Sequence, residues 1–322
     1  QTNQGTLSVA IGADAGTTSQ ATKSVAVGNL AGNTGQSAWT VAVGDEAGRT
    51  DQGILAISVG KKAGTTIQGD NSVSIGYLAG NSSQLVSSVA IGDSSGQTDQ
   101  GTLAVAVGKD AGKTSQGANS VAMGNLAGNS GQLVSSVAIG NSAGQITQGT
   151  LSVAIGKDAG KTSQLSSSVA IGDTAGQTSQ GTLAISVGKD AGSTSQGANS
   201  VAMGNLAGNS GQLVSSVAIG DSAGQINQGT LSVAIGHDAG TTTQGTTSIA
   251  MGNLAGNIGQ LVSSVAIGDE AGKTTQGTLA VAIGKDAGKT TQGTNSVAMG
   301  NLAGNSSQLV SSVAIGDSAG QT

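Results

Sequence analysis

The sequence predicts an all-β protein, a parallel β-solenoid (β-roll) of about twenty 16-residue coils. A repeat of 16 residues runs through the 322 residues without an insertion or deletion, and each repeat contains a short run of β-branched residues such as Val9-Ala10-Ile11. The 56 glycines stand between these runs in fixed positions. A repeat of constant length indicates equal coils that stack, because each residue is then held against its counterpart one coil away.

The composition excludes a conventional globular core. Hydrophobic residues make up 36% of the chain, but only 1% of the residues are aromatic, and Phe, Pro and Cys are absent. Large side chains that fill a thick interior are therefore missing, and disulfides and Cys-type metal sites are excluded. The net charge of −5 argues against a nucleic acid or an anionic membrane as partner.

The first element of each coil is a strand, predicted at residues 8–11 and their equivalents. Alternation directs Val and Ile to one face and Ala to the other, and β-branched residues favour strands. We expect the Val and Ile positions, with the Ala15 position, to form the core. The predicted core residues are Val9, Ile11, Ala15, Val25, Val27, Val41 and Val43.

Two unbroken glycine positions follow this strand and predict a corner. Gly12 and Gly16 each recur in every coil, at a spacing that would cost a helix about 1 kcal/mol per glycine. Such glycines suit places where φ is positive or where backbones approach closely. The predicted turn residues of the first two coils are Gly12, Gly16, Gly28 and Gly32.

A second short strand is predicted at about residues 17–20, ending on a glutamine that recurs in all coils. This position includes Gln20, Gln36, Gln52 and Gln68. We interpret it as a buried or half-buried amide ladder, in which each side chain bonds to the next coil. The alternative is a glutamine that caps the turn before the glycine that often follows it.

The Ala10 position predicts an association surface. It is Ala in seventeen coils and Ser in three, and with Val and Ile inward it would point outward as a strip of small residues. Flat strips of this kind allow chains to pack together in a closed oligomer. The predicted strip includes Ala10, Ala26, Ala42, Ala90 and Ala106. The alternative is that Ala simply suits the flank of a strand.

A longer period of 48 residues is superimposed on the coil. The residue before the Ser-Val-Ala or Ala-Val-Ala run cycles through Leu103, Asn119 and Ser135, and Met replaces Ile only in the Asn-Leu-Ala-Gly coils. We expect residues 1–322 to be one repetitive rod without a separate globular domain. Its coil number varies within the pattern, as suits a spacer, and we expect the chain to be part of a longer fibre.

The sequence predicts no catalytic, cofactor-binding or metal-binding residues, and hence no enzyme. His237 is the single histidine, which leaves no multi-histidine metal site and a single candidate base. Residues 156–162 imitate a phosphate-binding loop, but three residues instead of four separate their glycines. No apolar run approaches the roughly 20 residues of a membrane span.

The Ser-Val-Ala-Ile-Gly cores carry a resemblance to a known family. They occur at residues 8–12, 88–92, 136–140, 152–156, 168–172, 216–220, 232–236, 264–268 and 312–316. The sequence resembles the YadA-like head-domain repeats of trimeric autotransporter adhesins, and similar repeats occur in phage and viral fibre proteins. The resemblance implies a left-handed roll, a homotrimer, and an extracellular, cell-surface or virion-surface location. It also implies a host-cell or matrix surface as partner.

Two functional hypotheses follow. The first is an extracellular structural fibre or adhesin segment that provides reach, rigidity and multivalent attachment. The alternative is an ice-binding solenoid that uses the Thr18 position as a flat threonine rank. Ser82, Ser130 and Ile146 interrupt that rank.

Overall fold

Short parallel strands and tight turns form every coil of the computed structural model, which describes residues 2–321. No helix occurs among these residues. The chain divides into two compact units, residues 1–163 and 164–322. Each unit is a parallel β-solenoid, and together they contain about twenty turns. The predicted all-β solenoid is thereby confirmed, whereas a single continuous domain stays a prediction.

In unit 1 the Val-Ala-Ile runs form one parallel sheet in which each residue pairs with the residue 16 positions later, as Val9 pairs with Val25. The strands of this sheet are β2 (Val9–Ile11), β4 (Val25–Val27), β6 (Val41–Val43), β8 (Ile57–Val59), β10 (Val73–Ile75), β12 (Val89–Ile91), β14 (Val105–Val107), β16 (Val121–Met123), β18 (Val137–Ile139) and β20 (Val153–Ile155).

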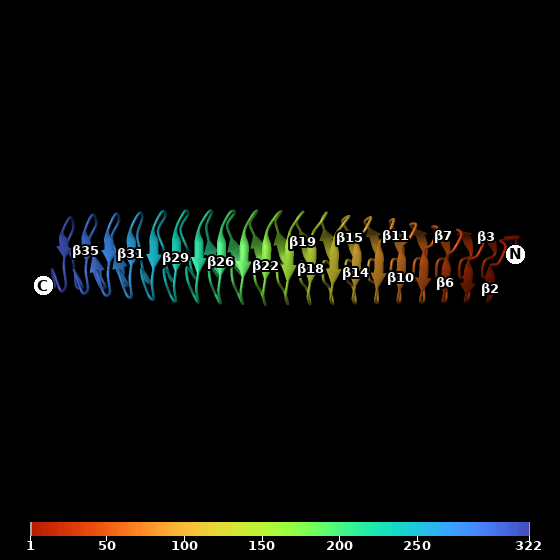
Figure 1. Ribbon diagram of the computed structural model, residues 1–322, viewed down its shortest axis with the longest axis horizontal. Coiled ribbons are helices and arrows are strands. Elements are labelled where there is room, and N and C mark those ends of the chain that lie inside the picture. Colours follow the sequence, from red (N-terminus) through yellow and green to blue (C-terminus); the bar gives the residue numbers. More distant parts are fainter. Residues whose placement is uncertain (1, 322) are drawn as a thin grey trace. The chain divides into compact units, whose positions relative to one another are not determined.

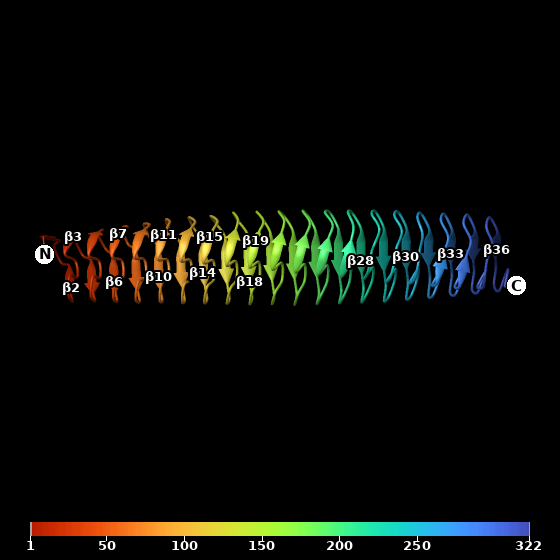
Figure 2. The same cartoon turned by 180° about the vertical axis from the view of Figure 1, so that it is seen from behind.

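The glutamine-ending strands form a second parallel sheet in the same register, with Gln20 paired to Gln36. Its strands in unit 1 are β1 (Thr2–Gln4), β3 (Thr18–Gln20), β5 (Thr34–Gln36), β7 (Thr50–Gln52), β9 (Thr66–Gln68), β11 (Ser82–Gln84), β13 (Thr98–Gln100), β15 (Thr114–Gln116), β17 (Ser130–Gln132) and β19 (Ile146–Gln148). The two sets of strands lie in separate rows along the unit (Figures 1 and 2).

Unit 2 repeats this design. The strands of its Val-Ala-Ile sheet are β22 (Val169–Ile171), β24 (Ile185–Val187), β26 (Val201–Met203), β28 (Val217–Ile219), β29 (Val233–Ile235), β30 (Ile249–Met251), β31 (Val265–Ile267), β33 (Val281–Ile283), β35 (Val297–Met299) and β36 (Val313–Ile315). The glutamine-ending strands are β23 (Thr178–Gln180), β25 (Thr194–Gln196), β27 (Ser210–Gln212), β32 (Thr275–Gln276) and β34 (Thr291–Gln292), and single bridges such as Gln244 to Gln260 continue their ladder. At the boundary in the chain lies β21 (Thr162–Gln164).

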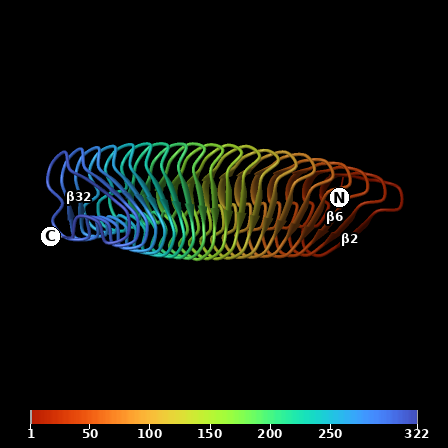
Figure 3. The same cartoon turned by 60° about the vertical axis from the view of Figure 1, so that its left-hand side comes forward.

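Glycine conformation makes the corner after the Val-Ala-Ile strand. The predicted turn residues Gly12 and Gly28 have φ of 129° and 132°, and Gly16 and Gly32 have φ of 52° and 50°. A Cβ added to Gly12 would lie 2.5 Å from the carbonyl oxygen of Gly28 in the next coil. Only glycine therefore permits both the turn and the close stacking of coils, which appear as nested loops in Figure 3.

The structure reverses the predicted facing of the first strand. The interior holds the Ala10 and Ala15 positions, and Ala26, Ala42, Ala90 and Ala106 are completely buried. The predicted strip is therefore part of the core and cannot be an association surface. Val9 and Ile11 are 42% and 59% exposed, and Val25, Val27, Val41 and Val43 are only partly buried, so these six residues are not the core.

The physical reason for this reversal is the thinness of the coil. Two sheets and two tight corners leave little internal space, and glutamines are the largest side chains completely buried in it. Alanine and serine occupy the rest, and a Val or Ile side chain would overpack the same place. The branched residues consequently face outward, where they still suit the strand backbone.

Candidate functional site

The first candidate site is the outer side of the Val-Ala-Ile sheet, which we call the outer face. It consists of two ranks of side chains, at residues 9 and 11 of the first coil and at every sixteenth residue after them. All forty of these positions hold Val, Ile or Met. Away from the terminal coils, the most exposed members, such as Ile155 and Met123, are 36 to 42% exposed.

The glutamine-ending sheet provides an internal comparison for this composition. Its exposed positions, residues 18 and 19 and their equivalents, hold Thr, Ser, Asn, Asp, Gly and Ile. The strand conformation alone therefore does not require apolar residues on an outward face. A surface in which no rank position is polar is typical of a face that another molecule covers.

The buried glutamines, including the predicted ladder residues Gln20, Gln36, Gln52 and Gln68, form the polar interior. Gln36 Nε2 donates to the Val25 carbonyl at 2.9 Å and to Gln52 Oε1 at 3.3 Å. Gln52 Nε2 in turn donates to Gln68 Oε1 at 3.2 Å. The Nε2 groups thus satisfy strand carbonyls, and in some coils the amides also bond to one another.

Serine in the Ala10 position completes this interior network in three coils. Ser58 Oγ donates to Gln68 Oε1 at 2.6 Å, and Ser186 Oγ donates to Gln196 Oε1 at 2.6 Å. In coils with alanine, several glutamine oxygens, such as those of Gln132 and Gln212, have no hydrogen-bond donor. The network holds the fold together, and because it is buried it offers no binding surface.

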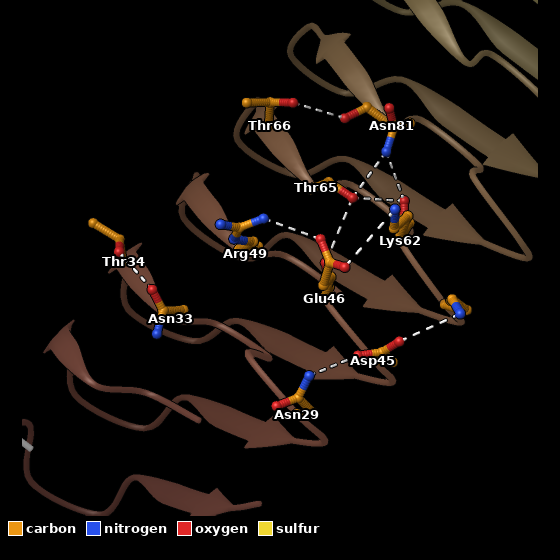
Figure 4. A network of polar contacts seen from close by, with 11 residues as sticks. Asn29, Asn33, Thr34, Asp45, Glu46, Arg49, Lys62, Thr65, Thr66 and Asn81 are labelled. Atoms are coloured by element: carbon orange, nitrogen blue, oxygen red, sulfur yellow. Dashed lines mark hydrogen bonds and ion pairs between the residues drawn. The ribbon is translucent and has the colours of Figure 1, made fainter. Parts of the chain in front are cut away.

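The charged corner is our name for residues 12–17 of the first coil and their equivalents. It carries 25 of the chain's 29 Lys, Arg, Asp and Glu side chains. In Figure 4, Glu46 lies between Arg49 and Lys62, with N···O distances of 3.0 and 3.8 Å. Asn29 Nδ2 donates to Asp45 at 3.0 Å.

Several of these pairs repeat with the 48-residue period. Asn205 donates to Asp221, and Asn253 donates to Asp269, each across one coil. Asp221 also lies 3.9 Å from His237, one coil further along. Lysines three residues after an acid pair with it, as Lys113 does with Asp110 at 2.8 Å. The charged side chains are therefore largely matched within the chain.

Two groups of titratable residues have shifted pKa values with local causes. The hydrogen bond from Asn29 lowers the pKa of Asp45, and nearby Lys61 acts in the same direction. Hydrogen bonds from Lys289 and Lys273 lower the pKa of Glu270. The pKa of Lys289 is raised by its bonds to Asp286 and then Glu270. These shifts are caused by surface hydrogen bonds and ion pairs, and they widen the pH range over which both partners of a pair are charged.

Catalytic and metal-binding groups do not gather anywhere in residues 2–321. No cluster of three or more His, Cys, Asp or Glu residues that could hold a metal ion lies in this part of the chain. In the loop that imitates a phosphate-binding motif, Lys161 pairs with Asp158 at 2.9 Å. The described residues also include no helix with the length and apolar character of a membrane span.

Comparison with known families gives one match. Residues 228–255 match the YadA head domain repeat in two copies. The matched segment contains strands β29 and β30, which both belong to the Val-Ala-Ile sheet. It also contains the buried residues Gln228 and Gln244. No curated protein has a significantly similar sequence. The other coils have the same length and the same glycine and glutamine positions. Residues 228–255 are thus YadA-like head repeats of the kind found in trimeric autotransporter adhesins, and they are set in a solenoid of like coils.

Proposed function

We propose that this chain is a segment of an extracellular or cell-surface fibre, in which three copies associate through their outer faces. The observation that carries the proposal is the unbroken apolar composition of both ranks of the outer face. Side chains that are about 40% exposed in a single chain, such as Met203, would leave water in the oligomer. Each square ångström of apolar surface removed from water contributes about 25 cal/mol.

Charge distribution supports the same arrangement. The outer face carries no charge, whereas the charged corner lies beyond Gly12 and its equivalents. Copies can therefore meet along the outer face without burying unpaired charges, while the charged corner keeps the fibre hydrated. The match to YadA head repeats favours three copies and a left-handed coil.

The fibre would act as an adhesive spacer that carries attachment surfaces away from a cell or virion. Stacked coils of equal length provide stiffness and reach, and several copies provide multivalent attachment to a host-cell or matrix surface. We propose no enzymatic activity, because the described residues bring no nucleophile, base and cleft together. We do not propose ice binding by the Thr18 rank, because Ile146 and several serines interrupt it on the exposed side of the second sheet.

The experiment that tests self-association places charge on the outer face. The variant combines Ile139→Lys, Ile155→Lys, Ile219→Lys and Ile267→Lys, all at exposed positions. The matched control combines Thr18→Lys, Thr114→Lys, Thr178→Lys and Thr194→Lys, which are exposed on the other sheet. Light scattering should give a trimer for the wild type and the control, and a monomer with a β circular-dichroism spectrum for the outer-face variant.

An outer-face variant that keeps the mass of the wild-type oligomer would overturn the proposed interface. Attachment is tested separately, by measuring retention of the wild-type oligomer on matrix-coated and uncoated surfaces. Equal retention on both surfaces would leave a structural fibre without adhesive activity.

A further inference from the structure

A second surface feature, the neutral corner, follows the 48-residue period. We define it as residues 5–7 of the first coil and their equivalents. Successive coils there read Gly-Thr-Leu, Gly-Ala-Asn and Leu-Val-Ser, as at residues 101–103, 117–119 and 133–135. Only Lys23 and Asp70 are charged among these sixty positions, and both have partners within the chain. The neutral corner leads directly into the outer face.

The period gathers apolar side chains into separate clusters on the neutral corner. The Leu103 amide donates to the Val86 carbonyl at 3.0 Å, and the Leu151 amide to the Val134 carbonyl at 3.1 Å. These four side chains are 44 to 62% exposed. Unit 2 contains equivalent clusters at Val214 with Leu231 and at Val262 with Leu279. Within a unit the clusters recur every three coils, or roughly 14 Å at about 4.8 Å per coil.

The surface beside one of these clusters is hollowed. The Gly-Ala-Asn coil leaves a hollow of about 250 Å³ beside Leu133 and Val134, with Gly117 on its wall. At this place an apolar projection and a hollow therefore lie side by side at the edge of the neutral corner. A smooth surface of identical coils would have neither.

The backbone makes the exposed leucines unusual. Leu103, Leu151, Leu231 and Leu279 have φ of 57° to 58°, a left-handed conformation that disfavours leucine and is adopted more easily by asparagine. Asparagine does occupy the same position in other coils, at Asn119 and Asn199. More than half of each of these strained residues stays uncovered within its own chain, which favours a role in contact with another molecule.

The outer face cannot by itself fix how far two copies are displaced along their length. Its ranks are Val or Ile in most coils, so a slip of 16 residues would replace each contact with a nearly identical one. The repeating residues of the charged corner make contacts within the chain, such as the hydrogen bond from Asn253 to Asp269. The neutral corner has a 48-residue pattern whose leucines are left exposed. Met203, Met251 and Met299 add the same period to the outer face.

We propose that the neutral corner sets the axial register in which copies of this chain associate. This inference rests on the proposed self-association. The partner is a second copy, because clusters that lie 48 residues apart within each unit match only a surface with the same spacing. In register, apolar clusters of different copies lie at equal heights and bury one another. A slip of one coil places the Leu or the Val of each cluster against a Gly-Ala-Asn coil or its equivalent instead, which leaves apolar side chains in water.

Distance measurements between copies test the register. The chain has no cysteine, so Lys109→Cys on the exposed charged corner provides one site for a nitroxide label per copy. Double electron-electron resonance on the wild-type oligomer should give one narrow distance. The test variant adds Leu103→Asn, Leu151→Asn, Leu231→Asn and Leu279→Asn, which place the natural alternative residue in a conformation that it favours. Its mass should stay that of the wild type, but the narrow population should fall at least twofold.

The matched control adds Thr114→Ser, Thr178→Ser and Thr194→Ser on the other sheet, and it should keep the narrow distance. A narrow distance that survives the four Leu→Asn changes would overturn the register proposal while leaving self-association intact. Several distances in the wild type would overturn it as well. A monomeric wild type would show a failure of the proposed function itself, and the register proposal would fall with it.

Discussion

At the scale of single residues, the buried glutamine is the side chain on which the coil depends most. Gln116 is 2% exposed, its Nε2 donates to the Val105 carbonyl at 2.8 Å, and its Oε1 accepts from Gln100 at 3.2 Å. A residue in this position both fills the interior and satisfies backbone groups that water cannot reach. Loss of either role at a buried position lowers the free energy of unfolding.

Gln116→Ala should therefore lower the free energy of unfolding by about 3 kcal/mol, because it opens a cavity and removes the hydrogen bond from Gln116 to the Val105 carbonyl. Chemical denaturation monitored by circular dichroism measures the change. Thr114→Ala, on the exposed side of the same strand, should change it by less than about 0.5 kcal/mol. Equal effects of the two substitutions would refute the structural role of the glutamine.

Ala202→Ser should raise the free energy of unfolding by about 1 kcal/mol. The new hydroxyl would donate to Gln212 Oε1, which lacks a donor, as Ser186 does to Gln196 in the preceding coil. Ala202→Val, in the same confined place, should instead lower it by about 1 to 3 kcal/mol. Denaturation midpoints of the two variants compare these outcomes, and a destabilised Ala202→Ser protein would contradict this account of the interior.

The prediction from hydrophobicity was wrong about which side chains of the first strand point into the interior. The rule that Val and Ile lie inside assumes an interior large enough to hold them. Variation in size at each position was the better signal, since the Ala10 position admits only Ala or Ser whereas the Ile11 position admits Val, Ile and Met. A confined space accepts one volume, and an open face accepts several.

At the scale of elements, the corners could be predicted and their bonding could not. Two unbroken glycine positions in a repeat without insertions indicate turns and stacking from the sequence alone. The left-handed φ at residues 3, 7 and 14 of the coil was not visible in the sequence, because Ser, Asp, Leu and Lys all occur at equivalent positions. Hydrogen bonds between successive coils hold these residues in place, and sequence patterns do not record such bonds.

Gly124→Ala should prevent stable folding around β16, or lower the free energy of unfolding by more than about 3 kcal/mol. Its φ is 129°, and the added Cβ would lie 2.5 Å from the Gly140 carbonyl oxygen. Gly131→Ala, seven residues later, meets no atom closer than 3.7 Å and should cost about 1 kcal/mol. Thermal unfolding of the two variants measures the difference, and similar stabilities would contradict the close stacking at Gly124.

The charged corner should give the protein a broad pH range of constant stability. The lowered pKa of Glu270 contributes stability above its usual value of 4.5, and this contribution disappears as the pH falls through the folded-state value. The raised pKa of Lys289 contributes below 10.5 and is lost at higher pH. Denaturation midpoints should therefore be flat from about pH 5 to 10 and fall outside this range, by a few tenths of a kcal/mol for such surface pairs. A midpoint that changes steeply near pH 7 would contradict this assignment.

At the scale of the whole molecule, the stacked coils solve the problem of folding without large side chains. The buried side chains are Ala, Ser and Gln, together with Thr40, so stability accumulates from neighbouring coils rather than from one thick core. Most of the remaining Val, Ile and Met side chains lie on the outer face, whereas further Leu and Val side chains are exposed on the neutral corner. The sequence analysis predicted an association surface at Ala10 and its equivalents, which are buried. The exposed surface is formed by their neighbours in the same strands.

The proposed fibre depends on association in solution, and the mass of the protein measures that association. Light scattering coupled to size exclusion should give about 91 kDa, which is three times the chain mass of 30.4 kDa. The mass should not change on moderate dilution, because two continuous apolar ranks are buried at once. A species of 30.4 kDa at micromolar concentration would contradict the account, since the outer face would then remain exposed to water.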